Sequence, residues 1–179
     1  CVAAVVLNPE CDVSPPYEIK DSKKCSEKKK LALREYIETY SIAYSVKMIS
    51  VKEIDSLNIL QATMKGMHQC IDDIRKTLEP DSLLVDGTYF NYYMTEDMEC
   101  IPHHCIAGGD DTYQSIAAAS ILAKTYRDEY MKQLVNDNPI LQEYGIEKNK
   151  GYGTKTHIDA LQTHGVTEYH RRSFKPCQK

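Results

Sequence analysis

The sequence feature that most constrains the fold is a short apolar run, Leu83 to Val85, that ends in Asp86 and Gly87. Consecutive apolar residues are typical of a buried strand, and a carboxylate at its end lies outside the core, where it can face a ligand. An Asp-Gly pair is also common in tight turns, and the local pattern alone favours a turn. The rest of the chain has to decide between these two interpretations.

A long helix is predicted immediately before this run. Ser50 and Glu53 have the spacing of a capping box at its start, and Pro80 terminates it. One apolar stripe recurs at helical spacing between them: Leu57, Leu60, Met64, Met67, Ile71, Ile74 and Leu78. Because a further strand is predicted before this helix, the order strand, helix, strand indicates an α/β fold.

The other predicted elements continue this alternation. Strands are predicted at 2–7, 42–49 and 99–107. Pro102 interrupts the last of them, which suggests an edge strand or a bulge. Helices are predicted after the N-cap Ser26, over 115–135, where the first side chains are small, and through 160–161 until Gly165.

Length and composition predict one soluble domain. With 179 residues and 42% hydrophobic residues the chain can bury one substantial core. No stretch approaches the length of apolar chain that crosses a bilayer, and the first residues do not resemble a signal peptide. We therefore expect a cytoplasmic protein, or a nuclear one if the source is a eukaryote, that acts as a monomer.

The charge of the chain argues against a generally basic surface for nucleic acid. The formal net charge is -4 and the isoelectric point is near 5.9. A local basic patch is still an alternative to an ordinary solvated face, because six lysines lie close together in the sequence: Lys20, Lys23, Lys24, Lys28, Lys29 and Lys30.

The cysteines predict reduced thiols, with one alternative. The chain has 7 of them, an odd number, and they are scattered. The segment from Cys100 to Cys105 also contains His103 and His104, so it offers four potential ligands for a structural zinc site. Four ligands within six residues cannot easily surround one ion, and strand side chains are the favoured interpretation.

A second acid repeats the pattern of Asp86. The predicted strand at 99–107 is followed by two glycines, Asp110 and Asp111, of which Asp111 is the weaker candidate because it lies further from the strand end. Two carboxylates at the ends of separate strands suit a Mg²⁺ site, because this ion takes carboxylate, water and phosphate oxygens. Asp128 lies within a predicted helix, where an ion pair is the expected role. The motifs of serine hydrolases, phosphate-binding loops and zinc peptidases are missing from the sequence.

Several motifs in order along the chain resemble type 2 ribonuclease H, the ribonuclease HII family. They are Asp21–Lys24, Glu53–Thr63, Leu84–Gly87, Gly109–Asp110, Ser115–Lys124, Arg127–Asp128, Lys150–Thr154 with His157, and His170–Phe174. The resemblance covers nearly the whole chain. It also favours the interpretation of Asp86 as a strand end that presents a metal ligand.

The resemblance implies a function and a fold. The function is an endonuclease that cuts the RNA strand of RNA–DNA hybrids, and ribonucleotides embedded in duplex DNA, by two-metal-ion catalysis with Mg²⁺ or Mn²⁺, leaving 5′-phosphate ends. The fold is a single ribonuclease H-like domain, with a mixed five-stranded sheet and helices on both faces over about 1–135 and a helical C-terminal extension over 136–179. The implied partners are RNA–DNA hybrid and ribonucleotide-containing duplex DNA.

The resemblance also implies roles for particular residues. Asp86 and Asp110 match two of the family's four metal-binding acids. Lys23 matches a phosphate contact, and Tyr152 matches a tyrosine that stacks on the sugar at the RNA-to-DNA junction, a role that suits an aromatic ring because the 2′-hydroxyl distinguishes RNA from DNA. Structural or supporting roles are implied for five further positions: Asp21, Ser115, Arg127, Asp128 and His157.

One part of the family pattern is missing from this sequence. The family carries its other two acids in an Asp-Glu-Ala-Gly-Arg-Gly stretch just upstream of the segment that 2–7 resembles. We therefore expect an N-terminal strand to be missing and the 179 residues alone to have little activity. The alternatives are a non-catalytic module that binds hybrids through Lys23 and Tyr152, and a zinc-stabilised structural protein.

Overall fold

The first two strands form an antiparallel pair. In the computed structural model, which describes residues 1–20 and 22–178, β1 (Val2–Val6) pairs with β2 (Ala43–Lys47), and Val2 lies opposite Lys47. The β-branched residues of β1 suit this extended, half-buried backbone. Both predicted strands are confirmed, and each is slightly shorter than its prediction.

The other two strands of the described residues form a parallel pair, and one of them contains the apolar run that ends in Asp86. β3 (Leu83–Asp86) pairs with β4 (His103–Ile106), with Asp86 opposite Ile106. The N–H of Gly87 extends the ladder to the carbonyl of Ile106 at 3.0 Å. Leu83 to Asp86 is therefore a strand, as predicted, and Gly87 leaves it at φ +117, a left-handed value that favours glycine.

β4 is shorter than the strand predicted at 99–107. Pro102 precedes the strand and accepts a hydrogen bond from the N–H of Leu83 at 2.8 Å, but its own ring nitrogen has no hydrogen to donate. Cys100 forms only an isolated bridge with Met94. The proline thus limits the parallel ladder to the residues that follow it.

The predicted five-stranded sheet is not what the described residues form. Their four strands make two separate sheets of two strands each, β1 with β2 and β3 with β4. A sheet requires a continuous ladder of backbone hydrogen bonds, and within residues 1–20 and 22–178 no strand bonds to both β1 and β3. The coarser prediction, helices combined with a parallel and an antiparallel pair of strands, agrees with the structure.

The single long helix predicted after Ser50 is two helices. The capping box of Ser50 and Glu53 is present and begins α2 (Val51–Leu57), and α3 (Ile59–Arg75) follows after one residue. That residue, Asn58, has φ +71, which no α-helix contains. Its Oδ1 accepts a hydrogen bond from the N–H of Gln61 at 3.1 Å and so caps α3.

The remaining helices lie close to their predictions. α1 (Glu27–Tyr40) begins after Ser26, whose side chain accepts a hydrogen bond from the N–H of Lys29. α4 (Gln114–Asp137) extends the helix predicted at 115–135 at both ends, and its small residues Ala117 and Ala118 are buried. Among the described residues, none of the helices is both long and apolar enough to cross a membrane.

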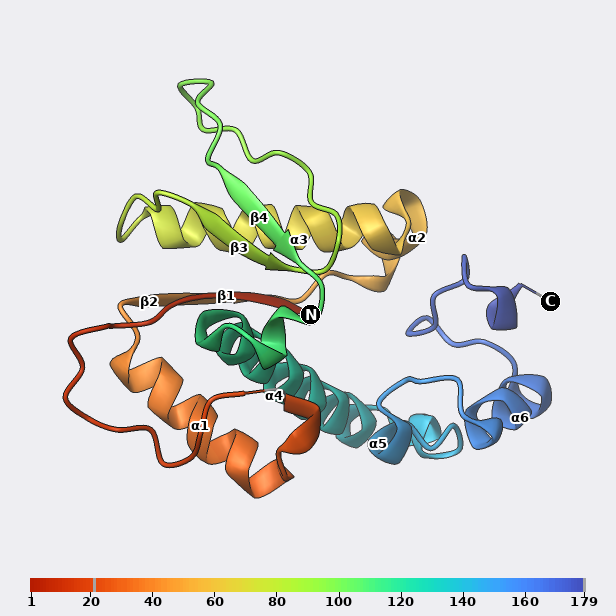
Figure 1. Cartoon of the computed structure of the whole chain (residues 1–179). Coiled ribbons are helices and arrows are strands. Elements are labelled where there is room, and N and C mark those ends of the chain that lie inside the picture. The colour runs from red at the N-terminus through yellow and green to blue at the C-terminus, as the bar shows by residue number, and fades with distance from the viewer. Residues whose placement is uncertain (21, 179) are drawn as a thin grey trace. The chain divides into compact units, whose positions relative to one another are not determined.

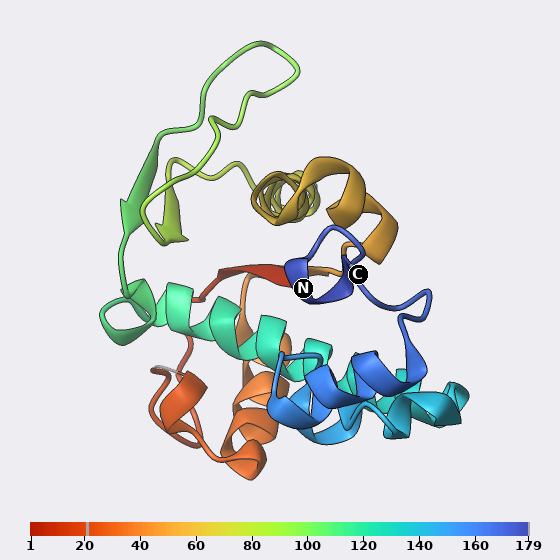
Figure 2. The same cartoon turned by 90° about the vertical axis from the view of Figure 1, so that its right-hand side faces the viewer.

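The described chain divides into two compact units, and the single domain stays a prediction. The first unit comprises residues 1–48 and 64–125, and the second comprises 49–63 and the residues from 126 onward. In the first unit, α3 packs on one face of the β3–β4 pair, as both views of the ribbon show (Figures 1 and 2). Six buried residues form the core there: Met64, Ile71, Val85, Phe90, Tyr93 and Ile101.

The second unit has its own core. Besides the end of α4 it contains η3 (Pro139–Gln142), α5 (Ile146–Asn149), α6 (Lys155–His164) and η4 (Lys175–Cys177). Five buried residues pack together: Val135, Leu141, Tyr144, Ile146 and Ala160. The Tyr144 hydroxyl donates a hydrogen bond to the carbonyl of Gly165 at 2.9 Å, at the predicted end of α6.

Candidate functional site

Asp86 is the last residue of β3, and its side chain is exposed. Successive side chains of a strand alternate between its two faces, so that Val85 lies in the core and Asp86 points away from it. The Oδ1 atom of Asp86 accepts a hydrogen bond from the backbone N–H of Gly109 at 3.0 Å. This bond ties the carboxylate to the segment that follows the neighbouring strand β4.

Asp110 lies in that segment, in the 3-10 turn η2 (Gly109–Asp111), and is 6% exposed. Gly108 enters the turn at φ +66, in the left-handed region. Gly109 lies against α4, because a Cβ atom at this position would be 2.5 Å from the Cδ1 atom of Ile116. The N–H that binds Asp86 therefore comes from the residue directly before Asp110, and the two predicted acids lie at adjacent points of the fold.

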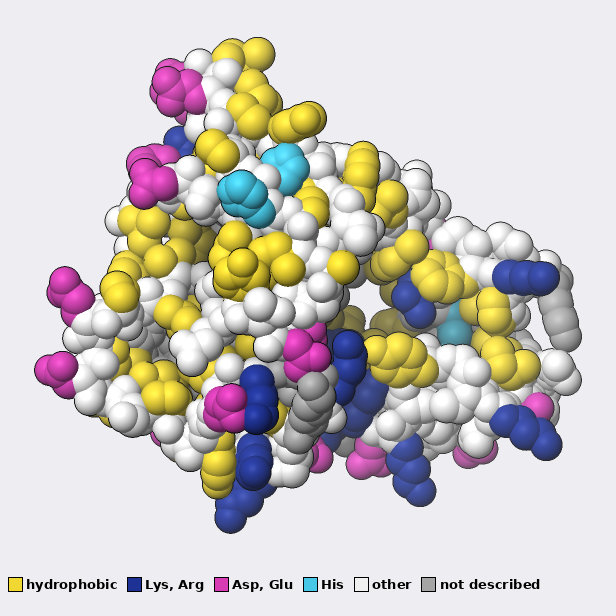
Figure 3. All heavy atoms as spheres, viewed as in Figure 1, with side chains coloured by type: hydrophobic (Ala, Val, Ile, Leu, Met, Phe, Trp, Pro, Cys, Tyr) yellow, Lys and Arg dark blue, Asp and Glu magenta, His cyan; other side chains and the backbone are white. Residues whose placement is uncertain are grey.

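Lys23 is the predicted phosphate contact on the same unit. It lies in η1 (Ser22–Lys24), and the Ser22 hydroxyl is 3.1 Å from that of Ser120 on α4. The Nζ atom of Lys23 is 3.9 Å from the Oδ2 atom of Asp110, and 76% of its side chain is exposed. Lys and Arg side chains lie beside Asp and Glu side chains around η1 on the face in Figure 3. Asp21, another position of the family motif, lies outside the described residues.

The Asp86–Asp110 pair offers hard oxygen donors, which suit one Mg²⁺ or Mn²⁺ ion. Such ions are commonly held by one or two carboxylates, with water and phosphate oxygens completing the shell. Over residues 1–20 and 22–178, no group of three or more His, Cys, Asp or Glu side chains is placed to hold a metal ion. The donor set of this pair therefore fits one ion, and a second ion would need oxygen ligands from elsewhere.

The alternative zinc site is not formed by the described residues. Successive side chains of β4 alternate between faces, which separates His103 from His104 and His104 from Cys105. The His103 ring packs edge-on against Phe90 and Tyr92, with centroid distances of 5.1 and 5.3 Å. The four potential ligands, which are close in sequence, therefore do not converge on one point.

Tyr152 belongs to the second unit, in the loop between α5 and α6, and is 63% exposed. Its hydroxyl accepts a hydrogen bond from Nη1 of Arg127 at 3.0 Å, and the guanidinium carbon lies 5.5 Å from the ring centroid. Arg127 also pairs with Asp128 at 2.6 Å, which confirms the ion pair predicted for Asp128. Arg127 thus contacts both the hydroxyl and the ring of the exposed Tyr152 side chain.

A pair of buried histidines lies next to the loop that contains Tyr152. His157, on α6, and His170 are 6% and 7% exposed, and their Nε2 atoms are 3.1 Å apart. The Nδ1 atom of His157 is 3.0 Å from the carbonyl oxygen of Tyr152. The sequence motifs contain both histidines, but neither spacing nor residue type shows that the two side chains meet.

Asp55 is a further residue whose contacts sequence reasoning missed. It lies on α2 and accepts hydrogen bonds from the backbone N–H of Arg172 at 2.9 Å and of Ser173 at 3.0 Å, and from the Ser173 hydroxyl at 2.6 Å. These bonds, those of Ser173 above all, lower the pKa of the Asp55 carboxyl. Asp55 therefore holds the C-terminal segment, at a separation in sequence that no local pattern reveals.

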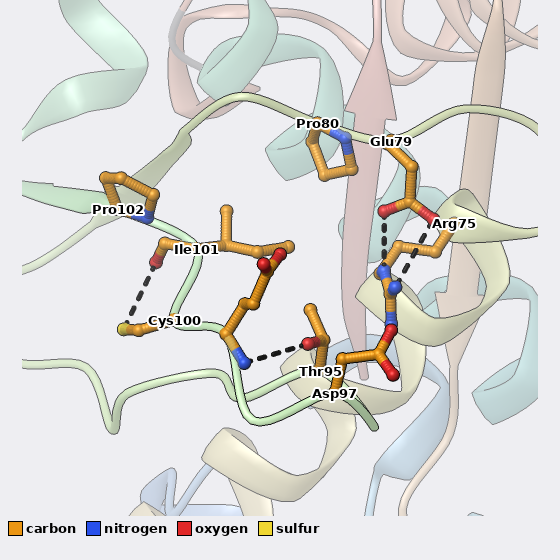
Figure 4. Close-up of a pocket in the computed structure, with 9 residues that line it drawn as sticks. Arg75, Glu79, Pro80, Thr95, Asp97, Cys100, Ile101 and Pro102 are labelled. Atoms are coloured by element: carbon orange, nitrogen blue, oxygen red, sulfur yellow. Dashed lines mark hydrogen bonds and ion pairs between the residues drawn. The ribbon is translucent and has the colours of Figure 1, made fainter.

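One pocket of the described residues is lined by neither of the two acids. It has a volume of about 350 Å³ beside the β3–β4 connection, and Figure 4 shows its wall formed by Arg75 with Glu79 on one side and the segment from Cys100 to Pro102 on the other. The Arg75 Nε atom is 2.8 Å from a Glu79 carboxylate oxygen, so the guanidinium is already paired. Neither Asp86 nor Asp110 lines this pocket.

Comparison with known proteins gives a consistent result. The family model described as "Ribonuclease HII" matches residues 1–177. The ribonuclease HII of Parabacteroides distasonis is 45% identical over 172 residues, which are 96% of this chain and 80% of that protein.

Solved structures agree at the level of the fold. The ribonuclease H2 from Pyrococcus horikoshii superposes with a TM-score of 0.69 at 19% identity, over 89% of this chain and 78% of that one. A structure described as Bst-RNase HIII in complex with Mn²⁺ superposes with a TM-score of 0.60 at 18% identity, over 89% of this chain and 56% of that one. The α/β fold of this chain is therefore the fold of these ribonucleases.

Proposed function

The chain belongs to the ribonuclease HII family of endonucleases, and on that premise we propose that it hydrolyses the RNA strand of RNA–DNA hybrids and cuts duplex DNA at embedded ribonucleotides. The observation that supports this most directly is the hydrogen bond from Gly109 N–H to Asp86, which holds the Asp86 carboxylate next to Asp110. The expected loss of activity has no support in the comparisons, and it is not part of the proposal.

In this proposal Asp86 and Asp110 hold one Mg²⁺ or Mn²⁺ ion. A bound ion of this kind polarises a phosphoryl oxygen and lowers the pKa of bound water. The relative in complex with Mn²⁺ makes a divalent cation reasonable for the fold. The Asp110 carboxylate is buried, so water screens its charge only weakly. The Asp86 carboxylate is exposed, so substrate can approach it.

Lys23 and Tyr152 are proposed to contact the substrate. The exposed ammonium group of Lys23, close to Asp110, suits a phosphate adjacent to the bound ion. The exposed ring of Tyr152 offers a flat surface on which a sugar can stack, and its hydroxyl is fixed by Arg127. The first contact would bind the nucleic-acid backbone, and the second would distinguish a ribose from a deoxyribose by its 2′-hydroxyl.

The test is cleavage of a DNA duplex that contains one ribonucleotide, with Mg²⁺ or Mn²⁺ and the full-length protein. Asp86→Asn keeps an oxygen that accepts the Gly109 hydrogen bond but removes the charge, so we expect at least about 100-fold lower activity with little loss of stability. Asp110→Asn should have a similar effect. The matched control is Asp97→Asn in the pocket wall, which should cleave like the wild type.

Two outcomes would contradict the proposal. Unchanged cleavage by both Asp86→Asn and Asp110→Asn would remove these residues from the metal site. If the wild type binds the ribonucleotide-containing duplex with equal strength in a chelator and never cuts it, the chain is instead a non-catalytic hybrid-binding protein.

A further inference from the structure

The two buried histidines of the second unit form a chain of hydrogen bonds that ends at Tyr152. Its first link joins Thr167 to His170: the Thr167 N–H is 3.1 Å from the Nδ1 atom of His170, and the Thr167 hydroxyl is 2.8 Å from the same nitrogen. The second link joins the Nε2 atoms of His170 and His157 at 3.1 Å. The third joins Nδ1 of His157 to the carbonyl oxygen of Tyr152 at 3.0 Å.

Hydrogen-bond chemistry fixes the proton on each ring. A backbone N–H only donates, so the Nδ1 atom of His170 is an acceptor and its Nε2 atom carries the hydrogen. The Nε2 atom of His157 must then accept, which leaves the hydrogen of His157 on Nδ1. That N–H donates to the carbonyl of Tyr152, which can only accept. In this arrangement each ring carries one hydrogen, and every ring nitrogen has a partner of the right type.

The same carbonyl also anchors the loop in a second way. The N–H of Thr154 donates to the Tyr152 carbonyl at 2.8 Å, and the N–H of Tyr152 donates to the carbonyl of Asn149 at 2.9 Å. Lys150 and Gly151 both have positive φ, at +53 and +82. The loop therefore has an unusual backbone, which several hydrogen bonds hold in place. The His157 side chain supplies one of these bonds.

The surroundings of His170 keep it neutral. Its ring packs against Tyr144 at a centroid distance of 4.8 Å and against His157 at 5.2 Å, and Arg171 is the next residue. Burial above all, together with the neighbouring His157 ring and the charge of Arg171, lowers the pKa of His170 to about 4. Burial lowers the pKa of Arg171 in turn, and the groups that act against this are Cys177, Asp55 of α2 and Tyr152.

We propose that His170 and His157 are positioning residues that, through a directed chain of neutral imidazoles, fix the backbone of Tyr152 and thereby the orientation of its ring toward the ribonucleotide sugar. This inference rests on the proposed contact of Tyr152 with substrate and adds the device that holds it. A proton added to either ring turns its accepting nitrogen into a donor, which breaks the chain. The ring of Tyr152 then keeps its Arg127 contact but loses the side-chain anchor of its backbone.

Two substitutions of His157 separate positioning from simple packing. The amide nitrogen of an asparagine lies near the place of histidine Nδ1, and the amide end of a glutamine lies near the place of Nε2. His157→Asn therefore keeps a donor to the Tyr152 carbonyl and loses the link to His170, whereas His157→Gln keeps the link to His170 and loses the donor. Both remove the buried ring, so both should lower the melting temperature.

The activity of the two variants on a duplex with one ribonucleotide carries the test. We expect His157→Gln to lower kcat/KM about tenfold or more, mainly through KM, and His157→Asn to stay within about threefold of the wild type. Equal activity of the two variants would overturn the proposal, because it would show that the donor to Tyr152 is without effect. If the wild type does not cut, or if Tyr152→Ala cuts as well as the wild type, the proposed function itself fails.

A second measurement needs no activity. Nitrogen-15 NMR of histidine-labelled wild-type protein distinguishes the two ring tautomers, and single variants assign the signals. We expect His157 as the Nδ1–H tautomer and His170 as the Nε2–H tautomer, with His170 neutral at pH 6. A charged His170 at pH 6, or His157 with its hydrogen on Nε2, would overturn the proposed chain even if every variant failed to fold.

Discussion

Gly109 has no side chain, and this allows its N–H to reach Asp86. A methyl group at Gly109 would lie 2.5 Å from the Cδ1 atom of Ile116, which is buried and cannot move freely. We expect Gly109→Ala to lower the free energy of unfolding by about 1–3 kcal/mol, the usual result of overpacking. It should also shift the N–H away from Asp86 and lower cleavage activity.

Removing the obstructing methyl group provides the control for this prediction. Ile116→Val deletes Cδ1, so Gly109→Ala combined with Ile116→Val should recover much of the stability and activity that Gly109→Ala alone loses. Urea unfolding and cleavage assays on the four proteins of this double-mutant cycle measure the coupling. Simple additivity of the two substitutions would show that Ile116 does not constrain Gly109.

The same residues show which part of the site the sequence could predict. Asp86 could be predicted as a strand end because the apolar run before it and the second acid-glycine segment are local patterns. The bond between Asp86 and Gly109 could not, since it joins residues through space across two strands. The pairing of His157 with His170 was beyond reach for the same reason, because periodicity and motif order do not specify which side chains meet.

At the scale of elements, Asn58 decides that α2 and α3 are separate helices. The apolar stripe predicted one continuous helix, because period alone continues through Asn58 without interruption. The stripe was also wrong in detail, since Leu57 and Leu60 at the break are exposed. A single residue with positive φ changes the direction of the chain while leaving the hydrophobic spacing intact, so the pattern could not reveal the break.

Asn58 gives a stability prediction of its own. Its φ of 71° and ψ of 163° lie in a region that glycine adopts freely and other residues adopt only with strain. Asn58→Gly loses the cap of α3, which costs a few tenths of a kcal/mol, but relieves the strain, so we expect a net stabilisation of about 1 kcal/mol. Asn58→Ala keeps the strain and loses the cap, so it should destabilise by about 1 kcal/mol. The free energy of unfolding in urea should therefore decrease from Asn58→Gly through the wild type to Asn58→Ala. An Asn58→Ala variant more stable than the wild type would contradict this account.

At the scale of the whole molecule, the fold class could be predicted better than the pairing of the strands. The number of residues and the alternation of elements predicted the α/β class, and the motif order predicted the family. The five-stranded sheet followed only from the resemblance, and the described strands form two pairs instead. Strand pairing depends on which backbone edges come together in space, and a list of strands does not contain this information.

The stability of the whole molecule should depend on pH through His170. Its pKa is about 4 in the folded protein and about 6.5 in an unfolded chain. Between these values the unfolded state binds a proton that the folded state does not, so stability is full above pH 6.5 and falls as the pH decreases toward 4. Between pH 7 and pH 5 we expect a loss of about 1–2 kcal/mol in the free energy of unfolding, measured by urea titration.

A substitution assigns this loss to one residue. His170→Gln removes the titrating ring, and its free energy of unfolding should therefore change much less between pH 7 and pH 5, although it is lower at every pH because the buried ring is gone. The exposed His164→Gln serves as the control and should keep the full pH dependence. The bonds from Ser173 lower the pKa of the Asp55 carboxyl, so its contribution to the stability of the protein is lost only as the pH falls below the usual pKa of an aspartate. This pH range lies below that of His170, so the two effects can be separated. A wild type equally stable at pH 7 and pH 5 would mean that His170 is charged or exposed in solution, and the neutral chain to Tyr152 would then have no basis.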